Sequence, residues 1–214
     1  QIRVELTSTS RVGMHRYTYP AGEKANVLFD VGALLAHGKT EKAAIHRISS
    51  KEIGGYSVLA PTSRRKKPVT VYFVARFNQN MTAFGGWEKE GKEKKLVHKN
   101  SIEGADIGGY ASFGKLKKQT LLMKVGISYV SEEQARINLE KELAHWNFDR
   151  VKEDAFAEWN RELGKITVEG GSEEEKIKFY TDLWHSLLGR HTFSDFNGKY
   201  IDNTGEEPVV RQVP

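Results

Sequence analysis

The 214-residue chain contains no cysteine. This absence excludes disulfides, thiolate metal sites and cysteine nucleophiles together, although it does not fix the cellular compartment. Long apolar runs are absent too, since no stretch approaches the roughly 20 residues that a membrane-spanning helix needs. The mean hydropathy is −0.56, and the first residues show no signal-peptide pattern. We therefore expect no membrane span in this chain.

Several motifs that carry chemistry are also missing. The chain has no phosphate-binding loop, no zinc-ligand spacing and no nucleophile elbow. Its acidic residues fall mostly on predicted solvated helix faces, as at Glu132, Glu133, Glu140 and Glu142. No carboxylate pair for glycoside hydrolysis can be picked out. We therefore assign no catalytic residue and no metal ligand within this chain.

Basic residues are in excess, with a net charge of +5. They form three clusters: Arg64-Arg65-Lys66-Lys67, then Lys89, Lys92, Lys94 and Lys95, then Lys115, Lys117 and Lys118. Each cluster adjoins Gly, Pro or Ser, which predicts solvated loops or hairpin tips between strands. Basic patches beside exposed aromatic residues also suit nucleic acids. Because glutamates dilute the largest cluster, we favour solvated hairpin tips and no nucleic-acid partner.

The first 130 residues predict a β-sandwich. Short segments of alternating or apolar pattern recur with turn signals between them, at residues 2–6, 15–19, 25–30, 43–48, 56–59, 69–77 and 110–113. Segment 69–77 is apolar on both faces, which predicts a central place in a sheet. Segment 78–91 carries Phe84, two glycines and Trp87, and we interpret it as a loop. Since no helical period interrupts the strands before Ser131, a βαβ fold is disfavoured.

The pattern changes from strand to helix after residue 119. Alternation over 119–130 predicts a half-buried strand, whose apolar face holds Leu121, Met123, Val125, Ile127 and Tyr129. Ser131 and Gln134 then form a capping-box pattern at the start of a helix.

Two more helices are expected. Asp149 is the predicted N-cap of the second helix, and Ser172 with Glu175 forms a capping box for the third, which ends near Gly189. The third helix is expected to turn an apolar stripe inward, namely Ile177, Tyr180, Leu183, Trp184 and Leu187. Trp146, Trp159 and Trp184 are all predicted to be core residues.

These patterns divide the chain into three parts. Residues 1–130 form the β-sandwich domain, incomplete at its N-terminus. Residues 131–170 form linker helices, and residues 171–214 begin a helical domain. The chain starts at Gln1 without Met and ends at Pro214 without a cap. We therefore expect it to be a fragment of a larger protein.

Three places are candidates for ligand contact. Trp87 follows two glycines and offers a flat apolar face with one N–H donor, which suits stacking on a sugar, although folding back onto the sheet is an equal alternative. Arg190, His191 and Asp195 cluster where the third helix ends and could form the rim of a site. Asp195 is also an ordinary turn residue. A cluster at residues 15–17, His-Arg-Tyr, could bind an anion or a sugar, but we favour strand packing there.

An ordered series of segments resembles glycoside hydrolase family 92. The series comprises residues 15–20, HRYTYP, then 125–131, VGISYVS, running into 135–142, ARINLEKE, then Trp159-Asn160, then 179–188, FYTDLWHSLL, and Phe193-Ser194-Asp195 with Gly198 and Tyr200. The family is expected to carry Phe at position 19. The similarity runs from Gln1 to about Tyr200 and is strongest after Val125.

The resemblance implies an exo-acting α-mannosidase that inverts configuration and depends on calcium. The implied fold is an N-terminal β-sandwich, linker helices and an (α/α)6 barrel, of which this chain would hold only the first helix. The acid, the base and the calcium ligands would lie beyond Pro214, so the fragment alone would be inactive. A periplasmic or secreted location and a mannose-containing glycan substrate follow from the same resemblance.

Two alternatives remain open from the residues. One is a non-catalytic carbohydrate-binding β-sandwich with a helical appendage, which would depend on Trp87. The other is a basic nucleic-acid-binding domain, whose affinity would fall steeply with salt. It would depend on Arg64, Arg65, Lys66 and Lys67.

Overall fold

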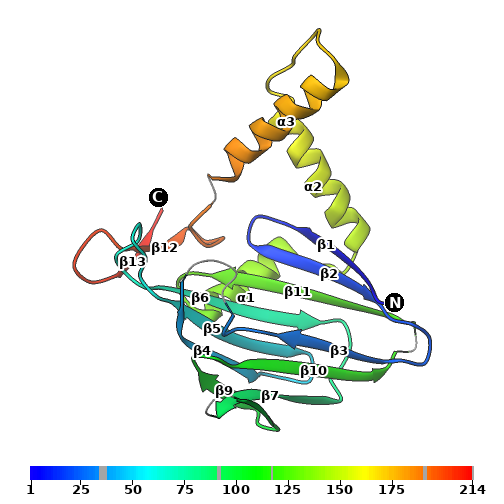
Figure 1. Cartoon of the computed structure of the whole chain (residues 1–214), viewed down its shortest axis with the longest axis vertical. Coiled ribbons are helices and arrows are strands. Elements are labelled where there is room, and N and C mark those ends of the chain that lie inside the picture. Colours follow the sequence, from blue (N-terminus) through cyan, green and yellow to red (C-terminus); the bar gives the residue numbers. More distant parts are fainter. Residues whose placement is uncertain (34–37, 91–92, 117, 190–191, 214) are drawn as a thin grey trace.

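The computed structural model describes residues 1–33, 38–90, 93–116, 118–189 and 192–213, which form two packed β-sheets followed by helices (Figure 1). The elements of the sheets and helices are β1 (Arg3–Ser8), β2 (Val12–Thr18), β3 (Lys24–Phe29), β4 (Thr40–Arg47), β5 (Glu52–Leu59), β6 (Val69–Phe77), β7 (Ala83–Glu90), β8 (Glu93–Val97), β9 (Ser101–Gly104), β10 (Gly108–Lys115), β11 (Thr120–Ser128), α1 (Glu132–Glu142), α2 (Phe148–Leu163) and α3 (Glu173–Leu188). A hairpin of β12 (Lys199–Asp202) and β13 (Val209–Gln212) follows. No helix within the described ranges is long and apolar enough to cross a bilayer.

The strands form a sandwich, as predicted. The larger sheet has the order β1-β2-β11-β6-β5-β4-β9, and the smaller has the order β3-β10-β7-β8. All of the strand pairings in both sheets are antiparallel. Strand β6 is the fourth of seven in the larger sheet, so the predicted central place of segment 69–77 is confirmed.

One hydrophobic core lies between the sheets. Phe77 of β6 is fully buried there and makes an edge contact with Phe113 of β10, with ring centroids 4.7 Å apart. Ile45 and Ile53 from the larger sheet face Phe84 from the smaller sheet in the same cluster. These side chains alternate with outward-facing neighbours, which is the period-two pattern that the sequence shows.

A second core lies on the other face of the larger sheet, under α1. Met14 of β2 and Val74 of β6 pack there against Ala135 and Leu139 of α1. Gly126 of β11 permits the close approach, because a Cβ at this position would lie 2.3 Å from the carbonyl oxygen of Ala135. Strand β11 is therefore covered on both faces.

The predicted half-buried state of segment 119–130 is wrong for this reason. Leu121 and Met123 enter the core between the sheets as expected, but Lys124 and Ser128 on the opposite face are also buried. Ile127, which was predicted to face inward, is 39% exposed. Alternation alone could not show that a helix covers the polar face.

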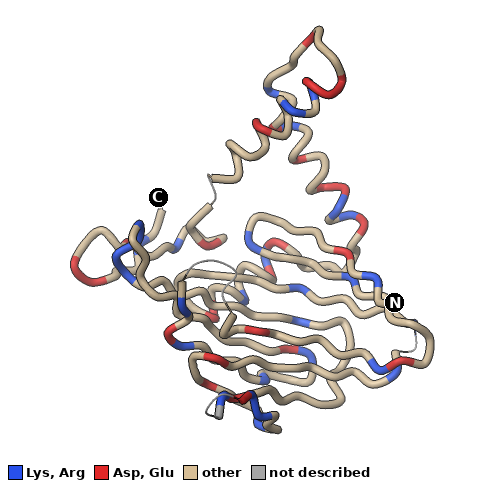
Figure 2. The backbone as a smooth tube through the Cα atoms, viewed as in Figure 1, with Lys and Arg blue, Asp and Glu red and all other residues tan. Residues whose placement is uncertain are grey.

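Helices α2 and α3 form an arm that projects away from the sandwich (Figure 1). Charged residues of both signs run along α2 (Figure 2), which buries only Phe148 and Val151 in its first turn. Helix α3 buries no residue. The predicted inward stripe is therefore wrong for the described chain, since Ile177 is 66% exposed and Trp184 is 37% exposed.

The prediction of core positions fails for Trp159 and Trp184. Trp159 is 37% exposed, and its ring meets Trp184 edge-on with centroids 6.1 Å apart. Trp146 is partly buried against the second core, but it lies in the connection between α1 and α2 and not on a helix. The Nζ of Lys124 lies 4.0 Å from the centroid of the Trp146 ring.

The predicted helix starts are largely right. The Ser131 hydroxyl accepts from the Gln134 backbone N–H, at 3.1 Å, and the capping box of Ser172 and Glu175 is complete. For the Gln134 side chain, Oε1 is buried with no hydrogen-bond partner among the described residues, so only half of the first predicted box forms. The predicted N-cap Asp149 is wrong, because Asn147 caps α2 and accepts from the backbone N–H of Arg150.

Several strands were missed or misplaced. Segment 78–91 was predicted to be a loop, but residues 83–90 form β7. Strand β5 begins at Glu52, so residues 52–55 do not separate two strands. Strands β8 and β9 and the hairpin β12–β13 were not predicted. Lys94 and Lys95 consequently lie on β8 and not in a loop.

Candidate functional site

The segment after α3 is held against the sandwich by a buried polar network centred on Asp195. Asp195 is 4% exposed. Its Oδ2 accepts from the Ser128 hydroxyl of β11 at 2.9 Å, and its Oδ1 accepts from Asn138 Nδ2 of α1 at 2.7 Å. Asn138 is fully buried, and its Oδ1 accepts from the backbone N–H of Phe196 at 2.8 Å. The network therefore joins the sandwich, α1 and the segment that follows α3.

Two further contacts fix the same segment. The Nε of Arg11 donates to the Ser194 carbonyl at 2.6 Å, and its guanidinium pairs with Glu142 at the end of α1. The ring of Phe193 stacks on Tyr129, with centroids 4.4 Å apart and planes at 15°. Residues 193–196 are thus fixed by side chains from three separate elements.

Asp195 was predicted as a substrate-rim residue, and the structure shows both of its carboxylate oxygens engaged inside the protein. Its carbonyl accepts from the Gly198 N–H at 2.8 Å, which closes a turn with Gly198 at a φ of 83°. A positive φ of this size favours glycine. Arg190 and His191 lie outside the described residues, so their predicted role at the rim stays a prediction.

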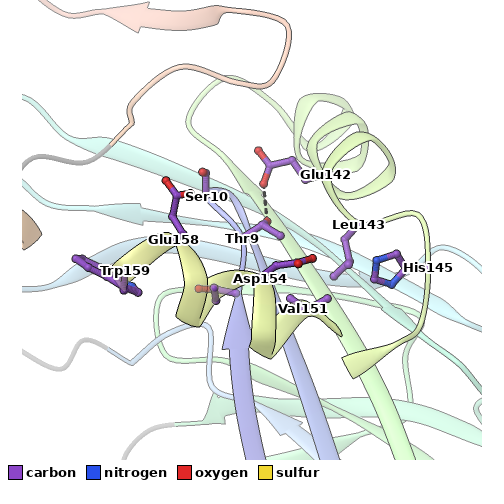
Figure 3. A pocket seen from close by; sticks show the side chains of 11 residues that line it. Thr9, Ser10, Glu142, Leu143, His145, Val151, Asp154, Glu158 and Trp159 are labelled. Atoms are coloured by element: carbon purple, nitrogen blue, oxygen red, sulfur yellow. Dashed lines mark hydrogen bonds between the residues drawn. The ribbon is translucent and has the colours of Figure 1, made fainter. Parts of the chain in front are cut away.

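A cavity of about 420 Å³ opens between the β1–β2 hairpin, the end of α1 and the side of α2 (Figure 3). Glu142, His145, Asp154, Glu158 and Trp159 lie on its wall. Glu142 is committed to Arg11 and to the Thr9 hydroxyl. Asp154 and Glu158 have side chains 71% and 58% exposed. A general acid needs a carboxyl group shielded from water, so this cavity does not provide one.

No metal site is evident in the part of the chain that the structure describes. No group of three or more His, Asp or Glu side chains there lies close enough together to hold an ion. The most enclosed carboxylates, Glu52 and Asp195, already accept from Arg76, Arg136, Ser128 and Asn138. These residues do not fit the oxygen cage that calcium needs.

The cluster at residues 15–17 is split between the two faces of β2. His15 and Tyr17 point toward the smaller sheet, with His15 Nδ1 2.8 Å from the Tyr17 hydroxyl. Burial lowers the pKa of His15 and raises the pKa of Tyr17 to about 12. Arg16 points to the other face, where it pairs with Glu5 and Asp149 and covers the Phe148 ring at 4.2 Å. The three side chains therefore make no joint site.

Trp87 lies on β7, with its ring against the backbone of the neighbouring strand. A Cβ at Gly108 of β10 would lie 2.0 Å from the Trp87 ring. The Nζ of Lys94 lies 5.5 Å from the ring centroid, and the Trp87 Nε1 is buried with no partner among the described residues. Of the two alternatives for Trp87, the structure shows the ring folded back onto the sheet. Its role in sugar binding stays a prediction.

The residues that organise this region were not identified from the sequence. Asn138 lies three positions after Ala135 and directly before Leu139, so a polar residue lies on the apolar face of α1. Lys124 and Ser128 likewise share the face of β11 that contacts α1. A polar residue at a position expected to be buried indicates a hydrogen-bonded partner. Asn138 could therefore have been identified from the sequence.

The sequence patterns of glycosyl hydrolase family 92 match the chain along most of its length. The N-terminal domain of the family matches residues 1–128, and the catalytic domain matches residues 134–211. The chain is 30% identical over 90 residues to an "uncharacterized secreted glycosidase" of Arthroderma benhamiae, a match covering 40% of this chain and 10% of that protein.

Solved structures show the same fold. A family GH92 alpha-mannosidase from Bacteroides thetaiotaomicron is 25% identical, with a TM-score of 0.83, over 100% of this chain and 28% of that one. A GH92 glycosyl hydrolase named ccman5 is 25% identical, with a TM-score of 0.85, over 99% of this chain and 27% of that one. An inverting GH92 mannosidase from B. thetaiotaomicron, 21% identical with a TM-score of 0.82, shares the fold over 99% of this chain and 28% of that one. The chain thus spans little more than a quarter of these proteins.

Proposed function

Since the chain belongs to glycosyl hydrolase family 92, we propose that it is part of an exo-acting α-mannosidase that removes terminal α-linked mannose from glycans. The observation that carries the proposal is the continuous match to both domains of the family, in the same order as the sandwich and the helices. The similarity to a GH92 alpha-mannosidase at 25% identity supports mannose as the sugar.

The mechanism that we propose is inverting. One carboxylic acid would protonate the leaving oxygen while a carboxylate activates water on the opposite face of the sugar, with the two groups ~6.5–9.5 Å apart. We place both groups outside this chain, because its enclosed carboxylates are committed to hydrogen bonds or ion pairs. The role of these residues is structural support: they hold the segment after α3 in place.

Calcium is proposed as a cofactor of the complete protein. Its 6–8 oxygen ligands would come from the remainder of the polypeptide, since the described residues form no such cluster. A secreted location is supported by the secreted glycosidase of A. benhamiae, and a periplasmic location stays a prediction. The natural partners would be a mannose-containing glycan and the rest of the same polypeptide, against which the exposed apolar residues of α3 would pack.

The test uses the full-length protein that contains this chain. Release of mannose from α-mannobiose would be followed by proton NMR, which distinguishes the anomers before they equilibrate. We expect β-mannose as the first product, loss of activity after chelation with EDTA, and recovery on adding Ca²⁺. A failure to cleave any α-mannoside would refute the proposal, and α-mannose as the first product would refute the inverting mechanism. Mannose release by residues 1–214 alone would show that catalytic groups lie within this chain.

A further inference from the structure

The outward face of the smaller sheet carries two aromatic rings. Phe84 and Ala111 point into the core between the sheets, so their strand neighbours at odd spacing point outward. The register pairs Tyr110 of β10 with Gly85 of β7, and Trp87 of β7 with Gly108 of β10. Both aromatic residues therefore lie on the face turned away from the core, each opposite a glycine.

The glycines allow both rings to lie flat on the sheet. A Cβ at Gly85 would lie 2.6 Å from the Tyr110 hydroxyl, just as a Cβ at Gly108 would collide with the Trp87 ring. Leu28 of β3 and Leu96 of β8 extend the apolar stripe on either side, paired with Tyr110 and Trp87. They are 70% and 68% exposed. The face is a shallow apolar strip across all four strands.

Every charged side chain at an outward position of these four strands is a lysine. Lys24 lies directly opposite Lys115, and Lys89 lies directly opposite Lys94. Like charges at directly opposed positions destabilise a sheet. Asp106 relieves the second pair, with carboxylate oxygens 3.3 Å and 3.1 Å from the two Nζ atoms. Lys24 and Lys115 have no oppositely charged partner among the described residues.

We propose that this face binds an anionic polysaccharide, with sugar rings stacked on Trp87 and Tyr110 and acidic groups at the Lys24–Lys115 pair. An aromatic ring backed by glycine presents one flat apolar face, which matches the C–H face of a sugar ring. Carboxylate or sulfate groups would neutralise Lys24 and Lys115, so the charge of the ligand complements that of the face.

Hydroxyl groups of the ligand also find partners on this strip. Ser112 and Asn26 are hydrogen-bonded to each other at 2.6 Å on the outward face, and the Tyr110 hydroxyl lies 2.7 Å from His98 Nδ1. These hydroxyl, amide and imidazole groups lie beside the rings and suit a polyhydroxylated ligand. Binding at this face does not require the hydrolase activity proposed above.

The experiment measures binding of the full-length protein to three probes. The probes are alginate, a polymer of uronic acids, then neutral mannan, and a 20-nucleotide oligodeoxythymidylate. Affinity electrophoresis and titration calorimetry at low salt would give the dissociation constants. We expect alginate to bind more tightly than either other probe and to be released as salt rises.

Variants locate the binding to this face. Trp87→Ala and Tyr110→Ala should each weaken alginate binding about tenfold, the scale of one lost stacking contact. The double variant K24Q/K115Q should weaken alginate binding and flatten its salt dependence. Phe156→Ala and Lys178→Gln are the matched controls, since both residues lie on the arm, away from this face, and should leave the affinity unchanged.

Three results would overturn the proposal. They are the absence of alginate binding, equal effects of face and control variants, and equal affinity for neutral mannan with the same sensitivity to Trp87→Ala. Tighter binding of the oligonucleotide with the same sensitivity to Trp87→Ala would assign the face to nucleic acid instead. Tyr110→Phe keeps the ring and should weaken binding less than Tyr110→Ala, and thermal melting identifies any variant that fails to fold. Mannose release by the unmodified protein is assayed separately, so failure of either proposal is recognised independently.

Discussion

The sandwich with α1 and the arm of α2 and α3 differ in how they are stabilised. In the sandwich, β6 and β11 are covered on both faces, by the smaller sheet and by α1. In the arm, α3 buries nothing, and the apolar side chains of Phe156, Ile177 and Leu188 are 69%, 66% and 46% exposed. Exposed apolar surface on this scale marks a surface that another part of a protein covers. The comparison indicates a self-supporting sandwich and an arm completed by further protein.

The largest difference is expected for equivalent substitutions in the two regions. Phe77→Ala removes a fully buried ring and should lower the free energy of unfolding by about 3–5 kcal/mol. In residues 1–214 alone, Phe156→Ala removes an exposed ring of the arm and should cost less than about 0.5 kcal/mol. Urea unfolding followed by circular dichroism measures both. Similar costs at the two positions would contradict the division into two kinds of region.

The link between the regions can be broken at Asp195. Asp195→Ala leaves the buried Ser128 hydroxyl and one N–H of the Asn138 amide without an acceptor, at a cost of about 2–3 kcal/mol. The exposed Asp154→Ala is the control and should be nearly neutral. If the two variants unfold at the same urea concentration, the Asp195 network does not anchor the segment after α3.

A smaller effect is expected from pH, at the contact between the sandwich and the start of the arm. Burial, with a lesser contribution from Arg76, lowers the pKa of Lys124 to about 8 from 10.5. In the unfolded chain, the Lys124 ammonium group keeps its proton to higher pH. Above about pH 8 the unfolded chain therefore binds more protons than the folded chain. The free energy of unfolding should rise with pH there, by at most about 1.4 kcal/mol per pH unit.

Substitution separates this contribution from others. Lys124→Met should remove the rise between about pH 8 and 9.5, a window below the raised pKa of Tyr17. Lys178→Met, at an exposed position of α3, should keep it. A rise that persists in Lys124→Met would assign the pH dependence to another group.

The sequence predicted the sandwich because its apolar residues alternate, and alternation reports the face that each residue occupies. Helix starts were predictable from local capping chemistry at Ser131 and Ser172. Strand β7 was missed because glycines at 85 and 86 suggest a loop. In the structure their side-chain space holds the Tyr110 ring on one face and Ile102 of the core on the other. A partner on another strand cannot be predicted from the sequence of β7 alone.

The candidate site was less predictable for a related reason. Asp195 resembles a rim or turn residue locally, and its burial depends on Ser128 and Asn138, which lie 67 and 57 residues away in the chain. The stripe on α3 is a correct reading of amphipathicity, but the described residues bury none of its side chains. Local pattern predicts which face is apolar and does not identify what packs on it.

Hydrogen–deuterium exchange on residues 1–214 alone and on the full-length protein tests the division between the two regions most directly. In the chain alone, the amides of β6, β11 and α1 should exchange slowly and those of α3 should exchange within the shortest labelling time. In the full-length protein, α3 should become as protected as α1. Slow exchange of α3 in the chain alone, or fast exchange in both proteins, would contradict an arm that is completed by the rest of the polypeptide.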